Sequence, residues 1–193
     1  MATGRAVRLP VAVLGVLAFS LLTASRAQGE IRISNLSVFL NDYDVTVHAV
    51  LFGVIPESLY ESLQTGIATH VRFQVELWQY NRLRPDRRIT GRTVERQLAY
   101  NVMTKEYKVV ALKGEQHEPY LTKDLREAQR VISEFRVGKL APAASLNPKE
   151  LYYIRVRSDV SLGGVNSWVA RWGGDAEETD WVRSDLLTVT RSQ

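Results

Sequence analysis

The most regular pattern of apolar and polar residues runs over positions 69–80. Apolar side chains at every second position form one face, and mostly polar side chains form the other. A period of two with one polar face is typical of a half-exposed antiparallel strand. Related patterns predict further strands over residues 31–40, 45–52, 90–100, 106–112, 151–160 and 181–190.

Two stretches have helical spacing instead. Ile55, Leu59 and Leu63 recur every fourth position, Pro56 suits a first helical residue, and Gly66 suits a helix stop. These features predict a short helix over about residues 56–64. The second predicted helix begins after Thr122 as N-cap and ends before Gly138, with a buried stripe of Leu125, Ala128, Ile132 and Phe135.

The order of these elements decides the fold class. We count about seven strands and two helices, and no strand–helix–strand unit recurs. Parallel strands need such crossovers, so the strands are expected to pair antiparallel. The sequence predicts a mainly β (α+β) fold, an antiparallel β-sandwich with two short amphipathic helices over an edge or an end. Loops are expected at 81–88, 140–148, 162–174 and 175–180.

The first 27 residues have the pattern of a secretory signal peptide. A basic start is followed by an uncharged apolar stretch over residues 9–22, and Ser25 and Ala27 supply small residues before a cut. We expect cleavage after Ala27, export to the bacterial periplasm, and a single β-rich domain over residues 28–193. An uncleaved membrane anchor is the alternative, although a spanning helix wants about 20 apolar residues.

Composition narrows the function classes. The chain has 193 residues, 45% of them hydrophobic, and no cysteine, which excludes disulfides, thiolate metal sites and a cysteine nucleophile. Its net charge is +4, but residues 1–27 hold three arginines and no acid. Without that leader the balance is nearly neutral, so global charge gives little reason to expect nucleic-acid binding.

Catalytic and metal-binding motifs are absent from the sequence. His48, His70 and His117 have no short zinc spacing, and Asn41 with Asp42 begins no complete calcium loop. There is no nucleophile elbow and no phosphate-binding loop. We expect no cofactor and no metal, while a hydrolase site assembled from distant residues stays an alternative.

An arginine-rich segment is the strongest local signal. It contains six arginines and two acids between residues 82 and 96, and no lysine. Guanidinium groups suit bidentate contact with carboxylates or phosphates. One interpretation is a docking surface for an envelope protein or for anionic lipid headgroups; the other is a solvated hairpin with local ion pairs. The candidate partner-binding residues are Arg82, Arg84, Arg87, Arg88, Arg92 and Arg96.

Aromatic residues give a second signal. Trp168 and Trp172 lie four residues apart in a glycine-rich stretch, where they are either a binding surface or core packing. A small-ligand pocket between sheet and helices, lined by Tyr60, Trp78 and Trp168, is the alternative function that this signal suggests.

Several short runs resemble one bacterial exported family. They include Leu-Gln-Thr-Gly-Ile at 63–67, Phe-Gln-Val-Glu-Leu-Trp at 73–78, and Asp-Trp-Val-Arg-Ser-Asp at 180–185. With the runs at 98–101, 104–107 and 152–157, they resemble the family called domain of unknown function 4390. The resemblance implies an exported single domain, often encoded beside a membrane sensor histidine kinase, and it implies no catalytic residue. We therefore expect a non-catalytic interaction or accessory domain with no integral membrane segment after signal cleavage.

Overall fold

The computed structural model describes residues 31–40, 43–163 and 176–189. The predicted signal peptide, Trp168 and Trp172 lie outside these residues. The described part forms ten strands, two α-helices and one short 3-10 turn. Their bounds are β1 (Arg32–Leu40), β2 (Val45–Phe52), α2 (Glu57–Gln64), β3 (Thr69–Tyr80), β4 (Arg87–Asn101), β5 (Glu106–Lys113), β6 (Tyr120–Thr122), α3 (Leu125–Ser133), β7 (Glu134–Val137), η1 (Ala143–Ser145), β8 (Leu151–Leu162), β9 (Ala176–Glu178) and β10 (Val182–Arg183).

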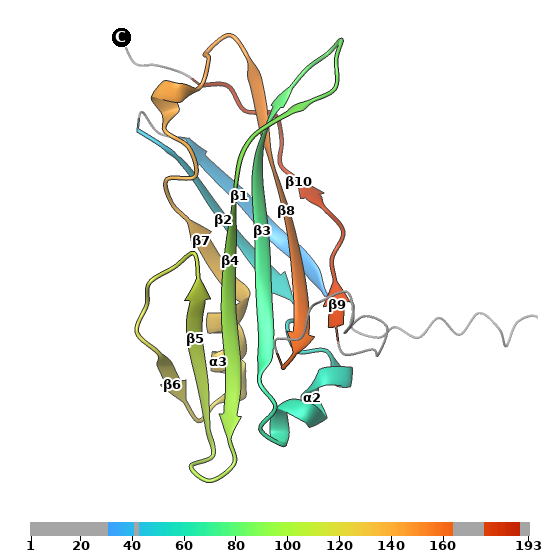
Figure 1. Ribbon diagram of the computed structural model, residues 1–193, viewed down its shortest axis with the longest axis vertical. Coiled ribbons are helices and arrows are strands. Elements are labelled where there is room, and N and C mark those ends of the chain that lie inside the picture. Colours follow the sequence, from blue (N-terminus) through green and yellow to red (C-terminus); the bar gives the residue numbers. More distant parts are fainter. Residues whose placement is uncertain (1–30, 41–42, 164–175, 190–193) are drawn as a thin grey trace, which may run out of the picture.

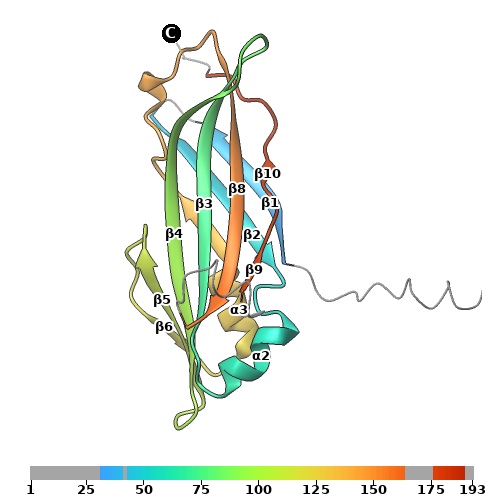
Figure 2. The ribbon, with the colours of Figure 1, turned by 45° about the vertical axis from the view of Figure 1, so that its right-hand side comes forward.

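Two antiparallel sheets form a sandwich, as the sequence predicts. The larger sheet has the order β10-β8-β3-β4-β5-β6, with β9 also paired to β8, and the smaller has the order β1-β2-β7. Figure 1 shows the smaller sheet crossing behind β3, β4 and β8. The turned view in Figure 2 shows α2 at one end of the long strands. The helix α3 packs near β5 and β6, as Figure 1 shows.

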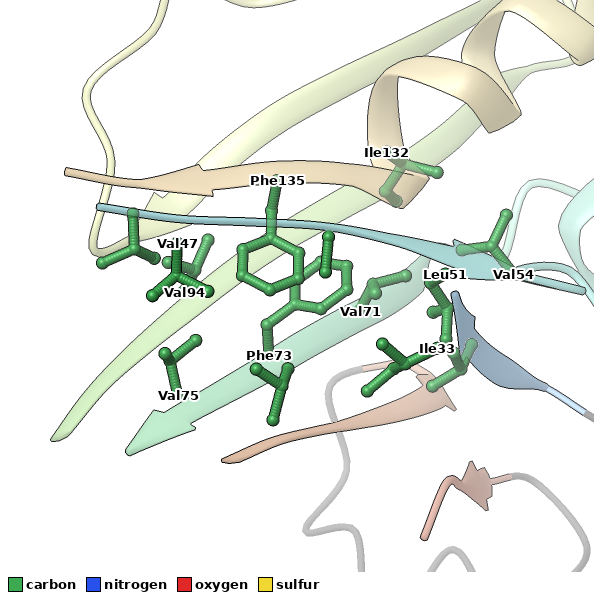
Figure 3. Packing of buried hydrophobic residues seen from close by; sticks show 14 of the residues in the cluster. Ile33, Val47, Leu51, Val54, Val71, Phe73, Val75, Val94, Ile132 and Phe135 are labelled. Atoms are coloured by element: carbon green, nitrogen blue, oxygen red, sulfur yellow. The ribbon is translucent and has the colours of Figure 1, made fainter. Parts of the chain in front are cut away.

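The core lies between the two sheets. Val71, Phe73, Val75 and Leu77 of β3 are fully buried on the inner face, as their period of two predicts. Phe73 stacks on Phe135 of β7 with ring centroids 4.3 Å apart, which joins the two sheets directly. Figure 3 shows this pair among the surrounding aliphatic side chains.

The second helix is shorter than predicted. It ends at Ser133, and residues 134–137 form β7 on the free edge of β2. Phe135 and Val137 are buried while Glu134 and Arg136 are exposed, which is the alternation of a strand. A spacing of three between Ile132 and Phe135 fits a helix equally well, so the sequence pattern did not distinguish them.

Smaller corrections concern element ends. The N-cap of α3 is Asp124, whose side chain accepts a hydrogen bond from the backbone N–H of Arg126, whereas we predicted Thr122. Residues 176–178 of the predicted acidic loop pair with β8 as β9. The predicted last strand is reduced to β10 and an isolated bridge between Leu187 and Tyr152. Within the described residues, no helix is both long and apolar enough to cross a membrane.

Candidate functional site

The six arginines of the predicted docking segment do not form one surface. They divide into a tip pair (Arg82 and Arg84), a middle pair (Arg87 and Arg88) and an inner pair (Arg92 and Arg96). The tip pair lies in the turn between β3 and β4, and the other two pairs lie on β4. The three pairs therefore have different surroundings.

The tip pair is exposed on a turn that is held in place. The Asp86 carboxylate accepts hydrogen bonds from the backbone N–H of Asn81, at 2.8 Å, and from the Tyr153 hydroxyl, at 2.8 Å. These hydrogen bonds, with the nearby positive charge of Arg183, lower the pKa of Asp86 although partial burial opposes them. The turn is therefore fixed at its base by an ionised carboxylate.

The apex of the same turn carries an apolar side chain. Leu83 is 92% exposed, and it stands between the exposed Arg82 and Arg84. Among the described residues, neither arginine has an ion-pair or hydrogen-bond partner for its side chain. The tip thus presents one leucine and two unpaired guanidinium groups.

The middle pair is bound within its own hairpin. Arg87 donates two hydrogen bonds to the Gln79 side-chain oxygen, at 3.2 and 2.8 Å. The Nε atom of Arg88 lies 3.1 Å from a Glu76 carboxylate oxygen. Both arginines therefore contribute to the ladder between β3 and β4, and their donors are partly occupied.

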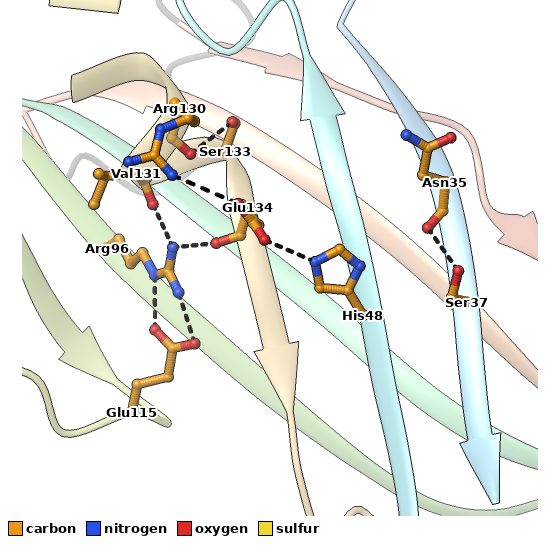
Figure 4. Close-up of polar contacts among 9 residues, drawn as sticks. All are labelled: Asn35, Ser37, His48, Arg96, Glu115, Arg130, Val131, Ser133 and Glu134. Atoms are coloured by element: carbon orange, nitrogen blue, oxygen red, sulfur yellow. Dashed lines mark hydrogen bonds and ion pairs between the residues drawn. The ribbon is translucent and has the colours of Figure 1, made fainter. Parts of the chain in front are cut away.

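The inner pair faces the second sheet. Arg96 is 8% exposed and forms a bidentate ion pair with Glu115, with N–O distances of 2.7 and 2.8 Å. Its Nη1 atom also donates to the backbone carbonyls of Val131 and Glu134 (Figure 4). Arg96 therefore ties β4 to the end of α3, where carbonyls lack helical partners.

Arg92 repeats this bridge further along β4. It donates to the carbonyls of Gly138, at 3.0 Å, and Lys139, at 3.3 Å, just after β7. In the register of β3 and β4, Arg92 lies opposite Val75 and Arg96 opposite Val71. Both arginines accordingly extend from the core face of the large sheet, so their role is to join the two sheets.

A glycine makes the buried ion pair of Arg96 possible. Gly114 follows β5 with φ of +81°, and a Cβ atom there would stand 2.3 Å from the Thr93 carbonyl oxygen. This positive φ and close backbone approach fit glycine and strain any other residue. The turn at Gly114 brings Glu115 back to Arg96.

The outer face of the large sheet carries interleaved charges and aromatic rings. Glu76 accepts hydrogen bonds from Arg155, at 2.7 Å, and from the Trp78 indole, at 2.9 Å. The Arg155 guanidinium lies between Trp78 and Trp181, 4.2 and 4.3 Å from their ring centroids. Burial raises the pKa of Glu76, but the hydrogen bonds and the charges of Arg155 and Arg88 outweigh burial and lower it.

Asp159 on the same face has the opposite shift. It is 5% exposed, and burial raises its pKa; Arg72, 3.9 Å away, compensates only in part. The negative charges of Glu178 and Glu95 raise it further. Glu76 and Asp159 are thus two buried carboxylates of one sheet face with opposite electrostatic balance.

The three histidines each lie beside a glutamate. His48 contacts Glu134 at 3.0 Å, His117 lies 3.7 Å from Glu115, and His70 lies 3.5 Å from Glu95. The described residues contain no group of three or more His, Asp or Glu side chains that could hold a metal ion.

His70 comes nearest to the arrangement of a hydrolase. It lies opposite Ser161 in the register of β3 and β8, next to Glu95. However, Ser161 is 3% exposed, and the Nε2 atom of His70 is 3.2 Å from the Gln97 amide nitrogen. No hydrogen bond between His70 and Ser161 is formed in the described part of the chain. A substrate would not reach this serine.

A groove opens between the two sheets beside the Arg96–Glu115 pair. Its volume is about 490 Å³, within the range of small-molecule sites. One wall is the end of α3 with β7, and the other is β5 with the chain leading to β6. The apolar lining is Val109, Ala111, Val131 and Phe135, with Tyr120. The remaining lining residues are His117 and the charged Arg96, Glu115, Glu118, Arg130, Glu134 and Arg136.

The predicted aromatic pocket is not brought together among the described residues. Tyr60 is 42% exposed on α2, at one end of β3. Trp78 lies near the other end of β3, stacked on Tyr153 with centroids 6.4 Å apart.

Sequence reasoning found Arg96 but missed the residues around it. Glu115, Arg130 and Arg136 come from separate elements, and no fixed spacing connects them to β4. The one signal present was the Gly114–Glu115 step directly after a strand, where a glycine often marks a tight turn.

Comparisons with known proteins give a family and no activity. No curated protein matches the chain, and no solved structure matches it. One family model, described as "Domain of unknown function (DUF4390)", matches residues 28–169, which is most of the chain and includes the arginine hairpin, the groove and all three histidines. The chain therefore belongs to the DUF4390 family.

Proposed function

We propose that this protein is an exported, non-catalytic docking domain of the bacterial envelope, which contacts an acidic protein surface through the β3–β4 turn. The observation that carries the proposal is the exposed tip of Arg82, Leu83 and Arg84, whose two guanidinium groups have no partner among the described residues. The leader sequence supports export.

The fixed base of the turn favours the docking interpretation and not the alternative of a merely solvated loop. The hydrogen bonds of Asp86 to Asn81 and Tyr153 order the turn before any partner arrives. An ordered turn loses less conformational entropy on binding than a mobile one. Burying a leucine side chain contributes roughly 2 kcal/mol, and flanking arginines steer an acidic partner toward it.

Acidic residues near the β3–β4 turn favour a protein as the partner and disfavour a membrane surface. Asp185 is exposed and Glu150 is half-buried, and both lie near the start of β8, at the tip end of the sheet. A flat anionic membrane would meet these acids together with the arginines. A protein with an acidic pocket would meet the tip alone.

Site-specific photo-crosslinking tests the proposal. A photo-reactive residue is placed at Leu83, and a matched one at Met103, which is 91% exposed at the tip of the β4–β5 turn. After illumination of cells that make the full chain, we expect an adduct to a distinct envelope protein from position 83 only. The adduct should vanish with Arg82→Glu and Arg84→Glu.

Two results would contradict the proposal. Equal adducts from positions 83 and 103 would show that the tip has no special partner. The second result has two parts: position 83 gives no protein adduct, and the purified chain binds anionic vesicles in a way that depends on Arg82 and Arg84. It would show that the partner is a lipid surface and not a protein.

A further inference from the structure

We propose that the groove between β5 and β7 binds an amphiphilic monocarboxylate, a small molecule with one carboxylate on an apolar body. Its apolar body would lie along Val109, Ala111 and Phe135, and its carboxylate would meet Arg136 at the mouth. This site is distinct from the arginine tip and does not depend on the docking function.

The back of the groove is electrically balanced. Arg96 uses two donors for Glu115 and two more contacts for backbone carbonyls, so four of its five N–H groups are engaged. Glu115 receives both ends of that guanidinium and is itself 7% exposed at its side chain. The back wall therefore offers packing rather than a free charge.

The charged side chains at the mouth of the groove, by contrast, are not all paired. Glu134 is shared by His48, at 3.0 Å, and Arg130, at 4.0 Å, as Figure 4 shows. Arg136 is exposed, lines the groove, and has no hydrogen bond or ion pair from its side chain among the residues described. An anion entering beside β7 thus meets one unpaired guanidinium group and the partly engaged Arg130.

The two lips of the groove have different charges, which gives the ligand a direction. Glu118 lies on the lip formed by the β5–β6 connection, whereas Arg130, Glu134 and Arg136 lie on the lip formed by α3 and β7, so this second lip has one more positive than negative charge. A carboxylate is repelled from the first lip and attracted to the second. The apolar body then extends over the half-buried Ala111, Tyr120 and Val131, while Val109 and Phe135 are buried in the groove wall.

Calorimetric titration of the full chain tests the site, with decanoate as the probe and decan-1-ol as its uncharged match. We expect saturable one-to-one binding of decanoate and at least tenfold weaker binding of the alcohol. Arg136→Gln should weaken decanoate about tenfold and leave the alcohol unchanged, because it removes only a charge-assisted contact. Ala111→Phe should weaken both by filling the groove.

The controls separate the groove from the tip and from loss of folding. Lys108→Gln changes an exposed charge of β5 next to the groove-lining Val109 and should leave decanoate binding unchanged. Arg82→Glu with Arg84→Glu should also leave it unchanged, even where partner capture is lost. Any of three results would overturn the proposal: equal affinity for decanoate and decan-1-ol, no saturable binding of decanoate, or unchanged decanoate affinity of the Arg136→Gln variant.

Discussion

Arginines at the two ends of one segment, Arg82 to Arg96, have opposite roles. Arg82 and Arg84 extend from a turn and have no partner among the described residues, whereas Arg96 is buried and makes four hydrogen bonds. The residue type is the same, and the sequence separation is small. The difference shows that the role of an arginine here follows from where β4 carries it: into the space between the sheets, or beyond the end of the ladder.

Mutation of the buried arginine and mutation of the exposed arginines should have different consequences. Removing a buried arginine that makes four hydrogen bonds takes the guanidinium donor away from one carboxylate and two carbonyls, so the protein should unfold more easily. Removing an exposed, unpaired arginine leaves nothing behind and should change stability little. Stability and partner binding should therefore separate along one segment.

The largest expected effect is at Arg96. Arg96→Met should lower the free energy of unfolding by about 3–5 kcal/mol, because Glu115 stays buried without its bidentate guanidinium partner. Urea unfolding followed by circular dichroism measures this change. A second variant that also carries Glu115→Gln should recover part of the loss. A loss of unfolding free energy below about 1 kcal/mol for Arg96→Met would show that this arginine contributes no more to stability than an exposed one, which would contradict the account.

The next effect is at Gly114, which positions the partner of Arg96. Gly114→Ala places a Cβ atom 2.3 Å from the Thr93 carbonyl oxygen at a residue with positive φ. We expect a loss of about 1–3 kcal/mol of unfolding free energy. Gly138→Ala is a matched control, since no atom lies within 4 Å of a Cβ there. Equal stability of the two variants in the same urea titration would contradict the tight approach.

A smaller loss of stability is expected at Glu76, which contacts Arg88 of the middle pair on the outer face of the large sheet. Glu76→Gln should cost about 1–2 kcal/mol at neutral pH by weakening contacts with Arg155 and Arg88. The pKa of Glu76 is lowered in the folded protein from an ordinary value of 4.5, so its stabilisation is present above that value and is lost as the pH falls through the folded pKa. The gap between Glu76→Gln and the unsubstituted chain should therefore narrow on acidification.

Asp159 should respond to pH in the opposite sense. Its folded pKa is raised above the ordinary value of 3.8, so its stabilisation is complete below that value and is lost as the pH rises through the folded pKa. Asp159→Asn should therefore be most favourable relative to the unsubstituted chain at neutral pH, and this advantage should fade in acid. Unfolding titrations at pH 7 and pH 4 test both carboxylates, and parallel trends for the two variants would contradict their opposite shifts.

The smallest stability effect is expected at the tip. Arg82→Glu and Arg84→Glu together should change the free energy of unfolding by no more than about 0.5 kcal/mol, because neither side chain forms a hydrogen bond or an ion pair among the described residues. Differential scanning calorimetry of the purified chain measures this. A loss comparable to that of Arg96→Met would mean that the tip arginines are structural as well.

Much of the fold could be predicted from the sequence because burial on one strand face imposes a period of two. That period places β2, β3 and β5 within a residue or so of their observed ends. It failed at Phe135, where helical and strand spacings coincide over a few residues and only the free edge of β2 favours β7. It also failed at 181–190, where only two residues pair as a strand.

The candidate site was less accessible to sequence reasoning. The arginine-rich segment was visible as composition, but its division into three pairs depends on which residues the sheet register turns inward. A bulge between Leu77 and Trp78 shifts that register, so Arg88 shares a face with Trp78 although a regular ladder would not pair them. The groove could not be predicted from the sequence, because Glu115, Arg130 and Arg136 are brought to it only by tertiary packing.

The most direct test of this contrast is quantitative capture of envelope proteins by the purified full chain after mild crosslinking. The Arg82→Glu/Arg84→Glu variant is compared with Lys108→Glu/Lys123→Glu, which makes the same change in net charge at exposed positions on and beside the β5–β6 edge. We predict that the tip variant loses a partner that the lysine variant retains, while both unfold at the same urea concentration. Retention of the same partner by both variants, or its loss from both, would contradict the assignment of the tip as the docking surface.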